Sequence, residues 1–263
     1  MTATEPSKKS YSLFYILLLG AAAATLLLCC LLNPLFLSLK SDIVLQELFV
    51  TAVLYYFDSV LEELIFATLI ALVAAGEYLF RGNKSRYITT KLLIFSVVLL
   101  KYICNFFATA IEAGFEGFTA TDFESLGLSL LFDLLILGGA FLASFLAVRR
   151  HFEKAKTLEK AYRIAGKGEF DEKAEFYPYR RFLAPKTPVL AGVFWGSLGT
   201  LLLKILSSLY YDLFFWGFPE TGEDAIQMVE NYAIILLLAV VSYTFAFFMS
   251  SFLLKEKNKK TAE

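Results

Sequence analysis

Residues 58–80, DSVLEELIFATLIALVAAGEYLF, form an apolar run long enough to cross a membrane as a helix, yet they include four acids. The acids are Asp58, Glu62, Glu63 and Glu77. The first three stand at the start of the run, so they are predicted to be the wet end of a span, with Glu63 the deepest. Glu77 lies four residues before Arg81, and we expect an ion pair between them at the other boundary.

The composition of the 263-residue chain is typical of a polytopic membrane protein. Hydrophobic residues make up 58% of it, and the mean hydropathy is +0.63, whereas soluble domains are about 45–50% apolar. Six stretches reach the length of a span, roughly 11–32, 60–80, 88–112, 126–148, 188–214 and 229–253. The sequence therefore predicts an all-α, polytopic transmembrane helix bundle with six spans.

Two segments near the N-terminus need separate interpretation. The run 11–32 superficially resembles a signal peptide, but it is too long and no small-residue cleavage site follows it, so we expect it to be retained as a span. Segment 41–57, SDIVLQELFVTAVLYYF, is also apolar, with polar residues near helical spacing. It is predicted either to lie as a helix in the membrane interface or to lengthen the second span.

Basic residues predict the orientation of the chain. All but three of the 24 Lys and Arg residues fall in the two terminal tails, around the loop after the second span, or in a long loop after the fourth. The positive-inside rule then places both termini in the cytoplasm, with the chain integral to the cell membrane. The predicted organisation is a cytoplasmic tail over 1–10, spans one to four over 11–148, a cytoplasmic loop with a helix over 149–187, spans five and six over 188–254, and a tail over 255–263.

The loop is predicted to begin by extending the fourth span as a helix, which Gly166 and Gly168 would end.

Similar features also recur along the chain. Lys101 and Lys204 are each followed thirteen residues later by a Gly-Phe pair, and the even-numbered spans carry polar residues at similar places, Glu63, Asp133 and Asn231. This pattern suggests three repeated helical hairpins in parallel orientation, of the kind found in many transporters.

Three charged residues are predicted to lie deep in the membrane. Lys101 is about 15 Å beyond Lys91, while Asp133 and Lys204 are each about 24 Å from the inner boundary. A charge at the bilayer centre costs roughly 2.5–3.5 kcal/mol, so these residues are expected to find partners inside the bundle. Asp133 and Lys204 match in depth and are predicted to pair. Lys101, with Asn105 one turn above it, is predicted either to join them or to snorkel outward.

These polar residues have two interpretations. They form either a substrate, ion or proton pathway, with the candidates Lys101, Asp133, Lys204, Glu63 and Asn105, or a structural ion pair beside a snorkelling lysine. Two stretches of small residues, GGAFLAS at 138–144 and GSLG at 196–199, are expected to let helices pack closely.

The sequence contains no catalytic motif. His151 is the only histidine, which excludes an HExxH zinc site and a Ser–His protease. The three cysteines lie in apolar runs without metal-ligand spacing, and no phosphate-binding loop occurs. Basic residues of the long loop are interleaved with acids, which argues against nucleic acid as a partner. The chain is therefore not expected to be an enzyme or to hold a cofactor or metal.

Two functions from different classes stay open. The chain is predicted to be a small permease with a buried charged site, or alternatively a non-catalytic membrane subunit or assembly factor of a larger complex. The second function would use the loop 149–187 to bind a protein partner. A permease requires that water reach Lys101, Asp133 and Lys204, whereas a scaffold would seal them in a dry pair.

Overall fold

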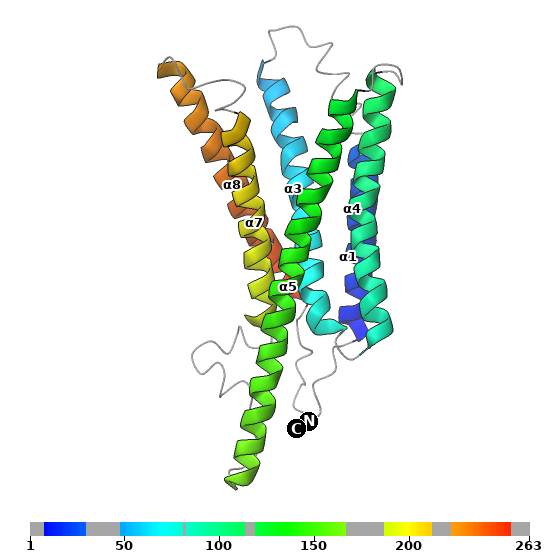
Figure 1. Cartoon of the computed structure of the whole chain (residues 1–263), viewed down its shortest axis with the longest axis vertical. Coiled ribbons are helices and arrows are strands. Elements are labelled where there is room, and N and C mark those ends of the chain that lie inside the picture. Colours follow the sequence, from blue (N-terminus) through cyan, green and yellow to red (C-terminus); the bar gives the residue numbers. More distant parts are fainter. Residues whose placement is uncertain are drawn as a thin grey trace.

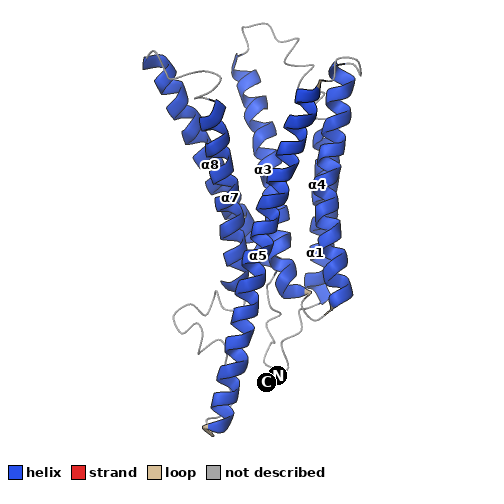
Figure 2. Cartoon of the chain, viewed as in Figure 1, coloured by secondary structure: helices blue, strands red, loops and turns tan. Residues whose placement is uncertain are grey.

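The secondary structure of the chain is helical throughout the part that can be described (Figure 1). The computed structural model describes residues 8–29, 48–80, 83–113, 119–166, 187–211 and 222–253. Figure 2 shows only helices with short connections in these ranges. The helices are α1 (Lys8–Leu27), α3 (Leu48–Leu79), α4 (Lys84–Ala113), α5 (Ala120–Ile164), α7 (Thr187–Tyr211) and α8 (Gly222–Leu253). The predicted all-α class is confirmed.

Four of the helices contain apolar stretches long enough to cross a membrane. The stretches are Ser85–Phe107, Leu126–Ile164, Val189–Tyr210 and Met228–Leu253. Their outer surfaces are apolar as well, because large side chains such as Leu92, Leu135 and Leu237 are more than half exposed. Exposed apolar surfaces of this size are stable in contact with lipid. The chain is therefore a multi-pass membrane protein.

Helix α3 lies at the centre of the bundle and contacts each of the other five helices described. All side chains from Phe66 to Ala75 are buried. A helix that is apolar on every side is buried on every side. Small residues on it, including Ala67, Ala71 and Ala74, let the neighbouring helices approach closely.

Successive helices run in alternating directions (Figure 1). The start of α1 lies beside the end of α3, where the Tyr11 hydroxyl donates a hydrogen bond to the Leu79 carbonyl at 3.0 Å. The rings of Phe14 and Phe80 meet edge to face there, with their centroids 5.0 Å apart. Each hairpin thus returns the chain to the end of the bundle from which it came.

The 45-residue helix α5 is longer than the bundle, and Figure 1 shows its C-terminal part extending past the ends of its neighbours. It ends at Ile164, just before Gly166, which has a left-handed φ of 62°. Glycine adopts this conformation without steric cost. The predicted helical extension of the fourth apolar stretch is confirmed.

The second predicted span is longer than expected. Helix α3 begins at Leu48, twelve residues before the predicted start at residue 60. Residues 48–57 continue this helix, so they lengthen the second apolar helix and do not form a separate interfacial one, while residues 41–47 lie outside the described part. Apolar residues in LFVTAVLYYF allow the helix to continue without a break.

The predicted close packing at small residues is found between α5 and α7, where Gly192, outside the two predicted stretches, also takes part. A Cβ added at Gly196 would lie 3.0 Å from the Ala140 Cβ and 2.8 Å from Ile70 of α3. At Gly192 a Cβ would collide with the Ser144 hydroxyl and lie 2.8 Å from the Ala140 carbonyl oxygen. Helix backbones approach this closely only where side chains are absent or short.

Candidate functional site

Two consecutive acids of α3, Glu62 and Glu63, begin the candidate site. Successive residues of an α-helix are rotated by about 100° around its axis, so their side chains point to different neighbours. Glu62 pairs with Lys101 of α4, with 2.6 Å between oxygen and nitrogen. Glu63 pairs with Lys204 of α7. The two carboxylates thus connect the central helix to one helix on each side.

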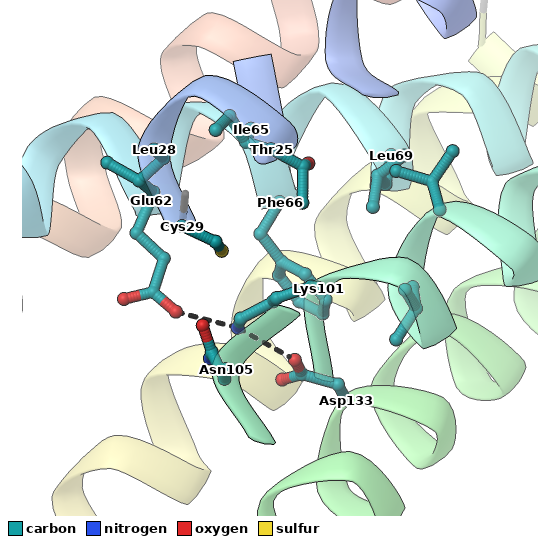
Figure 3. Close-up of a pocket in the computed structure, with 12 residues that line it drawn as sticks. Thr25, Leu28, Cys29, Glu62, Ile65, Phe66, Leu69, Lys101, Asn105 and Asp133 are labelled. Carbon is teal, nitrogen blue, oxygen red and sulfur yellow. Dashed lines mark hydrogen bonds and ion pairs between the residues drawn. The ribbon is translucent and has the colours of Figure 1, made fainter. Parts of the chain in front are cut away.

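Lys101 has a second acidic partner. Its ammonium nitrogen lies 3.2 Å from an Asp133 oxygen on α5. The hydroxyl of Tyr102 donates a hydrogen bond to the same oxygen at 2.8 Å. Figure 3 shows Lys101 between Glu62 and Asp133, with Asn105 beside it. Lys101 therefore bridges α3 and α5 from α4.

The Glu63 side of the site is more enclosed. Glu63 is buried, and the Ser242 hydroxyl of α8 donates a hydrogen bond to it at 3.1 Å. Lys204 is more open, with 38% of its side chain exposed. We refer to Glu62, Glu63, Lys101, Asp133 and Lys204 as the charge cluster. Its members and hydrogen-bond donors come from α3, α4, α5, α7 and α8.

The charge cluster lies well inside the bundle. Lys101 comes 17 residues after the first residue of α4, and Glu63 comes 16 residues before the last residue of α3. Both are therefore about 25 Å along the axis from the end of the bundle where α1 begins. Charges removed from water are stable only with partners, and each member of the cluster has at least one.

A small pocket adjoins the cluster between α1, α3, α4 and α5 (Figure 3). Its polar lining consists of Thr25, Glu62, Lys101, Asn105 and Asp133, together with the thiol of Cys29. The volume is about 60 Å³. A water molecule needs about 10–15 Å³ measured in this way, so the pocket accommodates a few waters or one small ion.

A second polar group lies at the end of the bundle where α1 begins. Glu77 is buried and lies 2.7 Å from the Lys91 ammonium, although the approach angle is not that of a hydrogen bond. Tyr87 donates a hydrogen bond to Glu77 at 2.9 Å. The Lys91 ammonium also lies 3.3 Å from the centroid of the Phe141 ring. Arg81, the predicted partner of Glu77, lies outside the described residues.

The structure brings the five sequence candidates into one region, but it corrects the predicted pair. Asp133 pairs with Lys101, and Lys204 pairs with Glu63, so the predicted Asp133–Lys204 pair is wrong. The prediction matched depth alone, whereas pairing also depends on which way each side chain faces around its helix. Lys101 points inward and does not snorkel. Asn105 lines the pocket.

Sequence reasoning missed three members of the site, Glu62, Tyr102 and Ser242. The predicted span begins near residue 60, which puts Glu62 at its wet end. Because α3 begins at Leu48, Glu62 is about four turns from its start. The apolar character of residues 48–57 is the signal that pointed to this depth. Tyrosine and serine in apolar helices carry no comparable signal.

Replacing Tyr102 by phenylalanine is expected to lower the free energy of unfolding by about 1.5–3 kcal/mol, because a hydrogen bond to a charged carboxylate is lost. The measurement is denaturant unfolding of the purified protein in detergent micelles. Tyr243→Phe is the matched control, since Tyr243 contacts Phe194 through its ring. Equal stabilities of the two variants would contradict the assigned role of the Tyr102 hydroxyl.

The chain is thus a multi-pass membrane protein that holds charged residues within its helical bundle. Comparisons of the chain with protein-family models, with curated proteins and with solved structures found no match.

Proposed function

We propose that the protein is a small permease with six spans, in which the charge cluster forms the ion or substrate pathway. The observation that carries this proposal is the ion-pair network that joins α3, α4, α5 and α7 beside a polar pocket. Ionisable residues inside a membrane are costly and commonly mark pathways. A single structural ion pair would need only two ionisable residues, whereas the charge cluster has five.

The partial exposure of the cluster supports a pathway. Half of the Glu62 side chain is exposed, and so is more than a third of Lys204. A dry structural pair would be sealed on all sides, as Glu77 is. Lys101 bridges carboxylates on two different helices, so it has an alternative partner whenever one of them is engaged by a ligand.

The proposed topology places both termini in the cytoplasm, in the cell membrane. The alternating direction of the helices supports it, because the basic segments then fall at one end. The proposed repeat of hairpins stays a prediction. It is supported by the matching roles of Lys101 and Lys204, each of which pairs with one of the two adjacent acids of α3.

The test is electrical recording from proteoliposomes adsorbed on a solid support. The membrane would be exposed to rapid jumps in proton, sodium and potassium concentration and to a panel of small charged metabolites. A permease predicts a transient current that is absent from protein-free liposomes and unchanged in Glu230→Gln, an exposed site on α8 outside the cluster. Absence of current under every condition would remove the support for a stand-alone permease.

A non-catalytic membrane subunit is the second candidate, and one observation favours it. The C-terminal part of α5 carries a row of exposed basic residues spaced to share one helix face, Arg149, Lys156, Lys160 and Arg163. Affinity purification in mild detergent tests this function. A stoichiometric partner that copurifies with the wild type but not with the double variant Lys156→Glu/Lys160→Glu would favour the membrane subunit. Purification of the protein without any partner would favour the permease.

A further inference from the structure

Counted over the part of the chain that the structure describes, the charge cluster has one positive charge fewer than negative charges. Three of its described members are carboxylates, Glu62, Glu63 and Asp133, and two are ammonium groups, Lys101 and Lys204. With all five ionised, the cluster carries a net charge of −1. An uncompensated charge away from water is costly. Another cation that binds here would therefore be held strongly.

The surplus negative charge is located at Glu62. Glu63 receives Lys204 and a hydrogen bond from Ser242. Asp133 receives the hydroxyl of Tyr102 as well as Lys101. Among the described residues, Glu62 has Lys101 as its one partner at ion-pair distance, and it shares that lysine with Asp133, while Lys204 interacts with it only from farther away.

Glu62 is also the acid of the cluster that can be reached from outside. Its side chain is 50% exposed, compared with 18% for Asp133 and 10% for Glu63. It lines the pocket, where the side-chain oxygens of Thr25 and Asn105 are further ligands for a cation. A volume of about 60 Å³ suits a small ion and excludes most metabolites.

We propose that this pocket binds one small monovalent cation, an alkali metal ion, at Glu62. If the proposed permease function holds, on which this step rests, the cation is its coupling ion. The binding is balanced in charge. The bound alkali ion neutralises the carboxylate of Glu62. The pairs Lys101–Asp133 and Lys204–Glu63 then remain, each with no net charge.

Binding at Glu62 has a structural consequence. Lys101 no longer needs Glu62, so the tie between α3 and α4 is released while the tie between α4 and α5 remains. Among the described residues, six titratable groups surround Glu62. They are Cys29 just after α1, Glu63 on α3, Lys101 and Tyr102 on α4, Asp133 on α5 and Lys204 on α7.

The test measures the melting temperature of the full-length protein in nanodiscs. The measurement series replaces choline chloride by sodium or potassium chloride at fixed pH and fixed ionic strength. A ligand at about 100 times its Kd raises the melting temperature by several degrees. The variant Glu62→Gln is expected to be at least as stable as the cation-free wild type and to lose the response.

Glu230→Gln is the matched control, because it removes the same charge from an exposed position on α8 and should leave the response intact. A higher melting temperature in sodium or potassium chloride than in choline chloride supports the alkali-ion site. The proposal is overturned if the wild type responds to neither, if Glu62→Gln still responds, or if this variant fails to fold. A cation response without any current in proteoliposomes would keep the site and reject the permease.

Discussion

A chain in which Lys101 is replaced by methionine is expected to lose about 3–5 kcal/mol of its free energy of unfolding. Methionine has a similar length but no charge, so Glu62 and Asp133 would lose their shared partner. The charge cluster would then hold three carboxylates and one ammonium group. The cost arises mainly from leaving two carboxylates unpaired, and it exceeds the contribution of the intact pair.

Unfolding by a denaturing detergent, followed by circular dichroism, measures this loss. Lys156→Met on the exposed part of α5 is the control and should change stability by less than about 0.5 kcal/mol. Adding Glu62→Gln and Asp133→Asn to Lys101→Met should restore most of the stability, because only the pair Lys204–Glu63 then remains charged. A stable single variant would show that Lys101 reaches water and is not held in the cluster.

The replacement of Gly192 by alanine is expected to lower the free energy of unfolding by about 1–3 kcal/mol. The new Cβ would collide with the hydroxyl of Ser144 and approach the carbonyl oxygen of Ala140 to 2.8 Å. A side chain could rotate away, but the carbonyl belongs to the backbone of α5. The two helices would have to separate, which would disturb the wider contact between α5 and α7.

Gly139→Ala is the control for this prediction, because a Cβ there meets nothing within 4 Å. Alanine is favoured over glycine in a helix by about 1 kcal/mol, so this control should raise stability slightly. Thermal unfolding of both variants in the same detergent gives the comparison. If Gly192→Ala were as stable as Gly139→Ala, the close approach of α5 and α7 would be wrong.

Much of the fold could be predicted from the sequence, because long apolar runs and breaks between them fix where helices occur in a membrane protein. The extension of α5 past residue 148 followed from helix-forming residues before Gly166. The start of α3 did not follow, because the acids in residues 58–63 resemble the end of a span. Their partners on other helices, Lys101 and Lys204, make these acids compatible with the bundle interior.

Four charged members of the candidate site could be predicted from the sequence, Glu63, Lys101, Asp133 and Lys204, but neither Glu62 nor the pairing could. A charge in an apolar run indicates that a residue is buried, and counting residues gives its depth. Neither shows which way the residue faces around its helix, and this orientation decides that Lys204 meets Glu63 and not Asp133. The central position of α3 determines the pairing, and it follows from the packing of all the helices.

The length of α5 connects the charge cluster to a distant point on the same helix. Asp133 and Ile164 stand 31 residues apart on one uninterrupted helix, a distance of about 46 Å. If the helix moves as a rigid rod, a tilt of about 10° at Asp133 displaces Ile164 by about 8 Å. A lever of this kind would convert the exchange of one charge inside the membrane into a displacement that a protein outside it can detect.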